Sequence, residues 1–202
     1  MTQLDHTESG MTGQARFDSY ADAGVLASID LVNQLTRRGR HDRALESAEA
    51  LLAIAQIMSV DPPSLAALTP GDTPGFVSLA GHLGDVFDDL HGDDVAAAAE
   101  RLNRLLANHP AQPHLAKEQG RWRLHHHPVD VALVPMWTSI CVEALARMIG
   151  AGFAERLGTC DDVECGRVFF DLSKNASRRF CSTTCQNRLK AAAFRRRQVA
   201  TD

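Results

Sequence analysis

The sequence predicts a mainly α-helical protein, with an N-terminal helical domain that includes a β-hairpin and a small C-terminal domain built from a β-hairpin and a helix around four cysteines. Three observations lead to this prediction. Apolar residues recur at helical spacing over most of residues 25–150, the spacing changes to strand-like alternation near residue 120, and four of the five cysteines lie between residues 160 and 185. With 202 residues, 45% of them hydrophobic, the chain is long enough to bury a core.

The first part of the chain predicts an arm followed by two helices. Residues 1–20 mix small and polar residues without an apolar period, which is typical of a mobile N-terminal arm. Apolar periodicity predicts a first helix over Val25–Leu35. The run Asp42–Val60 predicts a long amphipathic helix with Leu52 on its apolar stripe, and Pro62 with Pro63 prevents its continuation.

Two further helices follow, joined by a short loop. Thr73 is an expected N-cap with Pro74 at the first helical position, and apolar residues continue at helical spacing as far as Gly92. Asp93 and Asp94 are favourable at the start of a helix that runs to Asn108. These two helices are expected to pack against each other.

The pattern then changes to that of a β-hairpin. In His114–His125, Trp122 and Leu124 alternate with polar residues and Gly120 supplies the turn, so one face is expected to be apolar and the other cationic. The three histidines 125–127 end this segment. Because successive strand residues point to opposite faces, at most two of them converge, and we do not expect a metal site there. A helix over Asp130–Gly150 completes an N-terminal domain at residues 21–152.

The cysteine cluster carries the strongest chemical signal. Cys160 and Cys165 form a C-x4-C pair, Cys181 and Cys185 form a C-x3-C pair, and fifteen residues separate the pairs. Two closely spaced pairs joined by a short connector are typical of a closed, tetrahedral zinc site. Four thiolate ligands leave no open position for a water molecule, so one structural zinc ion is expected rather than a catalytic one.

The residues between and after the pairs predict a zinc finger over residues 158–200. Val168–Phe170 is an expected strand, and Ser177–Phe180 is an expected returning strand that pairs with it. Thr183, with Gln186 three residues later, predicts a capping box that opens the final helix. Such a domain is too small to build its own core without the metal.

Charge is distributed unevenly along the chain. Residues 1–165 carry 12 Lys and Arg against 23 Asp and Glu, a net charge of −11, whereas residues 166–202 carry 9 against 2, a net charge of +7. A compact basic segment favours a polyanionic partner, because Lys and Arg release counterions when they bind phosphates. The residues expected to contact nucleic acid are Arg178, Arg179, Arg188, Lys190, Arg195, Arg196 and Arg197.

The cysteine-rich segment resembles the CGNR zinc finger of bacterial transcription regulators. The resemblance rests on Cys160-x4-Cys165-Gly166-Arg167-x-Phe169-x-Asp171-x-Ser173-x-Asn175-x-Ser177-Arg178-Arg179-x-Cys181-x3-Cys185-x-Asn187-Arg188. Gln186 departs from the family pattern, which has Gly at this position, and we expect the metal site to tolerate it. The preceding chain resembles the ABATE domain of stress-induced transcription regulators through two segments, Ile29–Asn33 and Gly120–Leu124.

These observations predict a bacterial transcription regulator whose finger docks on DNA and whose N-terminal domain senses a small-molecule or protein effector, or forms a homodimer. The alternative is a zinc-finger module that binds an acidic protein, including the chain's own acidic body, or RNA, without sequence-specific DNA binding. We do not expect an enzyme, because the sequence has no phosphate-binding glycine loop, no HExxH motif and no G-x-S-x-G motif. No membrane span or export signal is expected, so the location is predicted to be cytoplasmic, on the nucleoid when bound to DNA.

Overall fold

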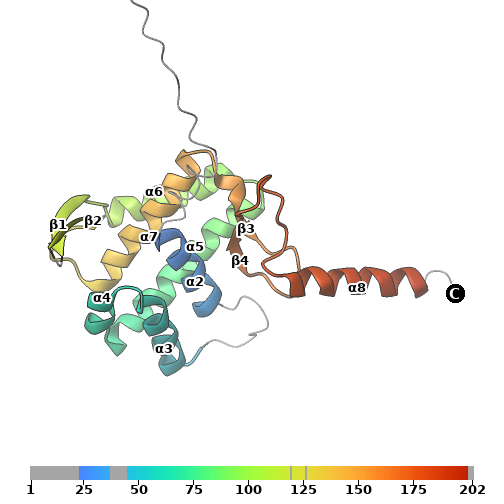
Figure 1. Cartoon of the computed structure of the whole chain (residues 1–202), viewed down its shortest axis with the longest axis horizontal. Coiled ribbons are helices and arrows are strands. Elements are labelled where there is room, and N and C mark those ends of the chain that lie inside the picture. The colour runs from blue at the N-terminus through green and yellow to red at the C-terminus, as the bar shows by residue number, and fades with distance from the viewer. Residues whose placement is uncertain (1–22, 37–44, 119, 126, 200–202) are drawn as a thin grey trace, which may run out of the picture.

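The computed structural model of the chain describes residues 23–36, 45–118, 120–125 and 127–199, and the expected N-terminal arm at residues 1–20 lies outside these ranges (Figure 1). The fold is mainly α-helical, as predicted. In chain order, its elements are α2 (Ala23–Leu35), α3 (Ser47–Met58), α4 (Pro62–Ala67), η1 (Pro70–Asp72), α5 (Thr73–His91), α6 (Val95–Asn108), β1 (His114–Glu118), β2 (Arg121–His125), α7 (Leu133–Gly150), η2 (Ala154–Arg156), β3 (Leu157–Thr159), β4 (Val168–Phe170) and α8 (Thr183–Val199).

The core lies where helices α2, α5 and α7 meet, with α3 and α6 packed on the outside. Its largest fully buried side chains include Phe76, Phe87, Leu83 and Met148. Helix α7 is long and apolar enough to cross a membrane by length and composition, but half of it is buried inside the protein. Since α7 packs against α2, α5 and α6, its apolar residues are explained by the core.

Several helix ends and faces differ from the sequence prediction. Helix α3 begins at Ser47, where Glu46 and Glu49 form a reciprocal capping box. Its buried face consists of Ala50, Ile54, Ile57 and Met58, whereas Leu52 is 72% exposed, so the predicted apolar stripe was wrong. The residues that face α2 and α5 decide which side is buried, and several apolar side chains on this helix allow more than one stripe.

The segment before α5 also corrects a prediction. Thr73 is buried inside the first turn rather than placed as the N-cap, because the 3-10 turn η1 precedes it. Thr69 caps that turn through the carboxylate of Asp72. The cap of α6 is as expected in kind, since the Asp94 carboxylate accepts a hydrogen bond from the Ala97 N–H at 2.9 Å.

Strands β1 and β2 form the predicted antiparallel hairpin, which lies at the opposite end of the molecule from α8 in Figure 1. In this register Leu115 faces Leu124, and Lys117 faces Trp122. The apolar face is exposed, with Trp122 67% accessible to solvent. The hairpin therefore extends the surface of the N-terminal part rather than its core.

The pairing of Val168–Phe170 differs from the prediction. Strand β4 pairs antiparallel with β3, which precedes the first cysteine, whereas Ser177–Phe180 is not a strand. The reason is local: the Asp171 carboxylate accepts hydrogen bonds from the Ser173 and Arg178 N–H groups, and the Arg178 guanidinium donates to the Phe170 and Phe180 carbonyl oxygens. These side chains satisfy backbone groups that a returning strand would otherwise pair.

The β3–β4 pair is closely packed, both between its two strands and against the helical core. Gly158 lies opposite Phe169, and a Cβ atom on Gly158 would lie 2.7 Å from the Phe169 ring. Leu157, Val168 and Phe170 are buried in the same core as the helices. The strand that leads into the first cysteine and the strand that leads out of the second therefore belong to the helical core.

Asn33 connects helix α2 to this strand pair. Its side-chain Nδ2 donates to the Val168 carbonyl oxygen at 2.9 Å, and its Oδ1 accepts from the Val168 N–H at 2.9 Å. The amide thus satisfies both backbone groups of one β4 residue, as a neighbouring strand would. One side chain of the N-terminal helices consequently holds a strand of the cysteine-containing region.

Removing this amide is expected to weaken the structure without changing its helices. Asn33→Ala loses two hydrogen bonds and leaves the partly buried backbone groups of Val168 without them, so we expect the free energy of unfolding to fall by about 1–3 kcal/mol. Urea unfolding followed by circular dichroism measures this change. Gln34→Ala, which removes an amide from the next position of α2, is the control, and an equal loss in both variants would contradict the proposed role of Asn33.

The division of the chain into residues 21–152 and 158–200 stays a prediction. A fragment ending near residue 152 retains α2 to α7 but lacks Leu157, Val168 and Phe170 from the shared core. We expect it to be helical and to unfold cooperatively, at a lower urea concentration than the whole chain. Denaturant unfolding of both proteins tests this expectation, and a fragment without a cooperative transition would place the boundary after β4.

Candidate metal centre and basic helix

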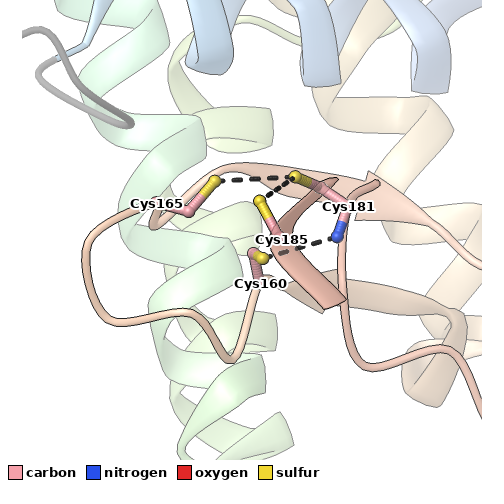
Figure 2. Close-up of side chains that lie close together, drawn as sticks. All are labelled: Cys160, Cys165, Cys181 and Cys185. Atoms are coloured by element: carbon pink, nitrogen blue, oxygen red, sulfur yellow. Dashed lines mark hydrogen bonds between the residues drawn. The ribbon is translucent and has the colours of Figure 1, made fainter. Parts of the chain in front are cut away.

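Four cysteine thiols converge at one point between β3, β4 and α8 (Figure 2). The Sγ atoms of Cys160, Cys165, Cys181 and Cys185 all lie within 4.8 Å of one another. Cys181 is half-buried and the other three are buried. The two pairs predicted from spacing thus form a single cluster.

Each cysteine is positioned by the backbone around it. Cys160 directly follows β3, and its N–H donates to the Arg167 carbonyl oxygen at 2.8 Å. Gly166 follows Cys165 with a φ of 59°, a left-handed conformation that reverses the chain and that glycine adopts without strain. The second pair lies at the start of α8, where the Ser182 hydroxyl accepts a hydrogen bond from the Cys185 N–H at 3.3 Å. Ser182 is therefore the N-cap, one residue earlier than the predicted Thr183.

The distances between the thiols fit a single zinc ion. Tetrahedral zinc with Zn–S bonds of about 2.3 Å requires sulfur atoms about 3.8 Å apart. The Sγ atoms of Cys165 and Cys181 are 3.5 Å apart, and those of Cys181 and Cys185 are 3.7 Å apart. Four cysteines within ligand distance, with no other donor type among them, form a zinc-finger site consistent with one structural zinc ion.

The electrostatics of the cluster also favour a cation. Burial, together with the neighbouring thiols, raises the pKa of Cys181 well above its usual value, and burial raises the pKa of Cys165. Burial acts in the same direction on Cys185, but hydrogen bonds from Ser182, the other thiols and Arg188 outweigh it and lower the pKa of Cys185. Four thiols this close do not all ionise unless a divalent ion compensates their charge.

Arg188 contacts the cysteine cluster directly. Its guanidinium lies 3.3 Å from the Cys185 Sγ atom, 2.7 Å from the Asp162 carboxylate and 3.5 Å from the Glu164 carboxylate. Only 24% of its side chain is exposed. Its contacts tie the loop between the first two cysteines to α8. The predicted contact of Arg188 with nucleic acid would have to compete with this arrangement.

The Arg178 side chain likewise makes its contacts within the finger. Its guanidinium lies 4.8 Å from the centre of the Phe169 ring and donates to the backbone oxygens of Phe170, Phe180 and Cys181. Arg179 is different, since its side chain is 73% exposed while it pairs with Asp161 at 2.6 Å. Of the two neighbouring arginines, Arg179 is the more available to a partner.

The other predicted contact residues lie on α8. This helix extends away from the rest of the protein (Figure 1). Its first two turns, with Cys185 and Arg188, belong to the cysteine cluster. Lys190, Arg195, Arg196 and Arg197 are all exposed along it. Because successive helical residues are rotated by about 100°, the three consecutive arginines cover more than one side of the rod. The seven predicted residues thus separate into two that build the finger and five that face solvent.

The structure also shows residues that sequence reasoning missed. Asp162 is a buried carboxylate between two cysteines, and its role depends on Arg188, which lies 26 positions later in the chain. Gln186 and Asn187 are exposed on the first turn of α8. An Asn or Gln side chain can make two hydrogen bonds to one adenine base. The two adjacent amide side chains directly after Cys185 were the available signal for residues able to contact a base.

Comparisons with protein families agree with this geometry. The model for ABATE, described as "putative stress-induced transcription regulator", matches residues 27–159. The chain belongs to the ABATE family. The CGNR zinc finger model matches residues 156–198, and the two matches overlap at β3, the strand that the ABATE core and the finger share. Among curated proteins, none matches the chain. Both families are of regulator and zinc-finger types rather than enzyme types.

Loss of one thiol is expected to unfold the finger while the ABATE helices stay folded. Structural zinc contributes on the order of 10 kcal/mol of apparent folding free energy to such modules, so Cys181→Ser should release the metal and unfold the cysteine loops and α8. Helices α2 to α7 should remain folded. Metal analysis together with amide NMR spectra of the zinc-loaded protein measures both effects.

Cys141→Ser is the matched control, because Cys141 is the buried cysteine on α7, away from the cluster. It should retain one zinc ion per chain. Full zinc content in Cys181→Ser with an unchanged finger spectrum would contradict the assignment of the site.

Proposed function

We propose that this ABATE-family protein is a DNA-binding transcription regulator whose finger holds one zinc ion through Cys160, Cys165, Cys181 and Cys185. The zinc ion would supply no reaction; it would fix the backbone around the thiolates and the first turn of α8. The observation that carries the proposal is the position of α8: a basic helix is anchored through its first two turns, by Cys185 and Arg188, and its remainder extends away from the body (Figure 1).

The dimensions and charges of α8 suit a DNA groove. Its 17 residues span about 25 Å at 1.5 Å per residue, and the major groove of B-DNA is about 12 Å wide, enough for an α-helix. A helix in that groove has phosphates on both sides, which agrees with cations on more than one side of α8. Lys190, Arg195, Arg196 and Arg197 would contact phosphates, while Arg179, Gln186 and Asn187 would read base edges.

The acidic body favours the same arrangement. Residues 1–165 carry a net charge of −11 and would be repelled by phosphates, so the protein would approach DNA with α8 first. The alternative, in which the basic finger binds the chain's own acidic body, agrees with the pairing of Arg179 with Asp161 and of Arg188 with Asp162. The outer part of α8 does not support it, because it points away from that body (Figure 1). Binding of RNA or of a separate acidic protein is the remaining alternative. The proposal includes a cytoplasmic location for the protein.

Removing one cation from α8 is expected to weaken binding to every DNA sequence. Each phosphate contact contributes about 0.9 to the slope of log K against log salt. Lys190→Ala should therefore reduce the slope by about one unit, and the triple variant of Arg195, Arg196 and Arg197 to Ala by up to about three units. Fluorescence anisotropy of labelled duplexes at several salt concentrations measures both the affinity and the slope.

Arg104→Ala is the matched control for Lys190→Ala, because Arg104 is an exposed cation on α6 and its removal changes the net charge by the same amount. It should leave the slope unchanged. If the zinc-loaded protein does not bind DNA at low salt but binds RNA or an acidic protein, the regulator proposal fails and the interaction module replaces it.

A further inference from the structure

A pocket of about 720 Å³ opens beside the β1–β2 hairpin, away from the finger. Its walls come from the start of α2, the region from Val60 to α4, strand β2 and the N-terminal half of α7. Its volume lies within the range of small-molecule sites. Most of its lining is apolar, including Leu124, Met136 and Ile140, and none of the lining residues takes part in the proposed DNA contact.

A single negative charge faces this apolar space. Among the described residues that line the pocket, Asp61 is the only one of the acidic and basic types, and it is half-buried. Its carboxylate accepts a hydrogen bond from the Ser64 hydroxyl, and no cationic side chain in the described part of the chain pairs with it. Because a half-buried charge is stabilised by an opposite charge, the carboxylate favours a cationic group in a ligand.

Ser64 and Trp137 fix the position of this carboxylate in the wall of the pocket. Ser64 is only 2% exposed, and its hydroxyl accepts a hydrogen bond from the Trp137 Nε1–H at 3.0 Å while it donates to Asp61. The charge and the aromatic ring therefore keep a defined arrangement. A carboxylate can accept about four hydrogen bonds, so its contact with Ser64 leaves capacity for the N–H groups of a ligand.

The two histidines in the lining make their contacts without a positive charge. His127 Nδ1 donates to the Pro128 carbonyl oxygen at 2.8 Å, and His127 Nε2 lies 3.2 Å from His125 Nδ1. A neutral His127 accepts through Nε2 from the Nδ1–H of a neutral His125, so neither contact requires a further proton. His114, opposite His125 in the hairpin register, stacks on the His125 ring with centroids 5.4 Å apart and supports this pair.

We propose that this pocket binds a small organic cation, an amine whose ammonium group faces Asp61 and whose apolar body lies against Trp137, Met136 and Ile140. The ammonium group donates hydrogen bonds to the carboxylate, and burial of the apolar body supplies the rest of the affinity. The net charge of −11 on residues 1–165 attracts cations to this part of the protein. An anionic molecule of the same shape is repelled by Asp61.

Three probes with the same indole body test the proposal on the zinc-loaded whole chain. Tryptamine carries an ammonium group, indole-3-ethanol is neutral and indole-3-acetate is anionic. We expect tryptamine to bind at one site per chain, about fivefold more tightly than the alcohol, because a half-buried ion pair contributes roughly this factor. Indole-3-acetate should bind least. Equal affinities for tryptamine and the alcohol would overturn the assignment of a cation.

The two tryptophans of the chain report where the probes bind. In ¹⁵N-labelled protein each gives one indole N–H signal in the NMR spectrum, and Trp122→Phe assigns them. Trp137 lies in the pocket wall, whereas Trp122 is exposed on the hairpin and outside the lining. Tryptamine should shift the Trp137 signal and leave that of Trp122 in place. The reverse pattern, or no shift of the Trp137 signal with any probe, would overturn the proposal.

Asp61→Asn tests the charge, because its amide oxygen can still accept the hydrogen bond from Ser64. We expect the affinity for tryptamine to fall about fivefold, to that of the alcohol, whereas binding of the alcohol itself should change less than about twofold.

Asp130→Asn is the matched control. Asp130 is exposed and outside the lining, its removal changes the net charge by the same amount, and asparagine tolerates its φ of 58°. This variant should bind tryptamine as the unmodified chain does. An equal loss of tryptamine affinity in both variants would overturn the assignment to Asp61. Since no DNA is present in these measurements, their outcome is independent of the DNA-binding proposal.

Discussion

The docking of the β3–β4 pair on the helical core joins the two parts of this protein, through Asn33, which pairs with both backbone groups of Val168, and through Thr159, which donates to the Phe87 carbonyl oxygen of α5. It places β4 beside α2, and the burial of Val168 and Phe170 then makes the strand part of the helical core. Because β4 follows Cys165 after only two residues, the position of the cysteine cluster is set from the N-terminal helices. The finger is therefore attached to the ABATE core through a shared strand pair rather than through a flexible connection.

Helices α2 and α7 both run from a pocket beside the β1–β2 hairpin towards the β3–β4 strand pair. Helix α2 begins at that pocket with Ala23 and Gly24, and Asn33 near its other end binds β4. Helix α7 lines the pocket with its first turns and leads after its end through η2 into β3. The Lys and Arg residues of the finger, which form one group in the sequence, have two different roles in the structure. Arg178 and Arg188 organise the cysteine loops, and the outer cations of α8 remain exposed.

Sequence reasoning predicted the parts that depend on local spacing. Helices α2, α3, α5, α6, α7 and α8 follow from apolar periodicity and capping patterns, the His114–His125 hairpin from alternation, and the four-cysteine cluster from the paired Cys spacing. The short helix α4 was not predicted. The parts that depend on distant partners were not predictable. The partner of β4 was one such case, because Asp171 and Arg178 satisfy the groups of the expected returning strand. Another was the approach of His114 to His125, which requires the strand register, and a third was the pairing of Arg188 with Asp162.

Hydrogen exchange of the zinc-loaded and chelator-treated protein tests most directly whether the β3–β4 pair belongs to the helical core. If it does, removal of the metal should leave the amides of Leu157–Thr159 and Val168–Phe170 protected to nearly the same degree as those of α2 and α5. The amides of the cysteine loops and of the first turn of α8 should exchange much faster. Loss of protection in β3 and β4 together with the cysteine loops would show that zinc, and not the contact with Asn33 and the core, holds these strands.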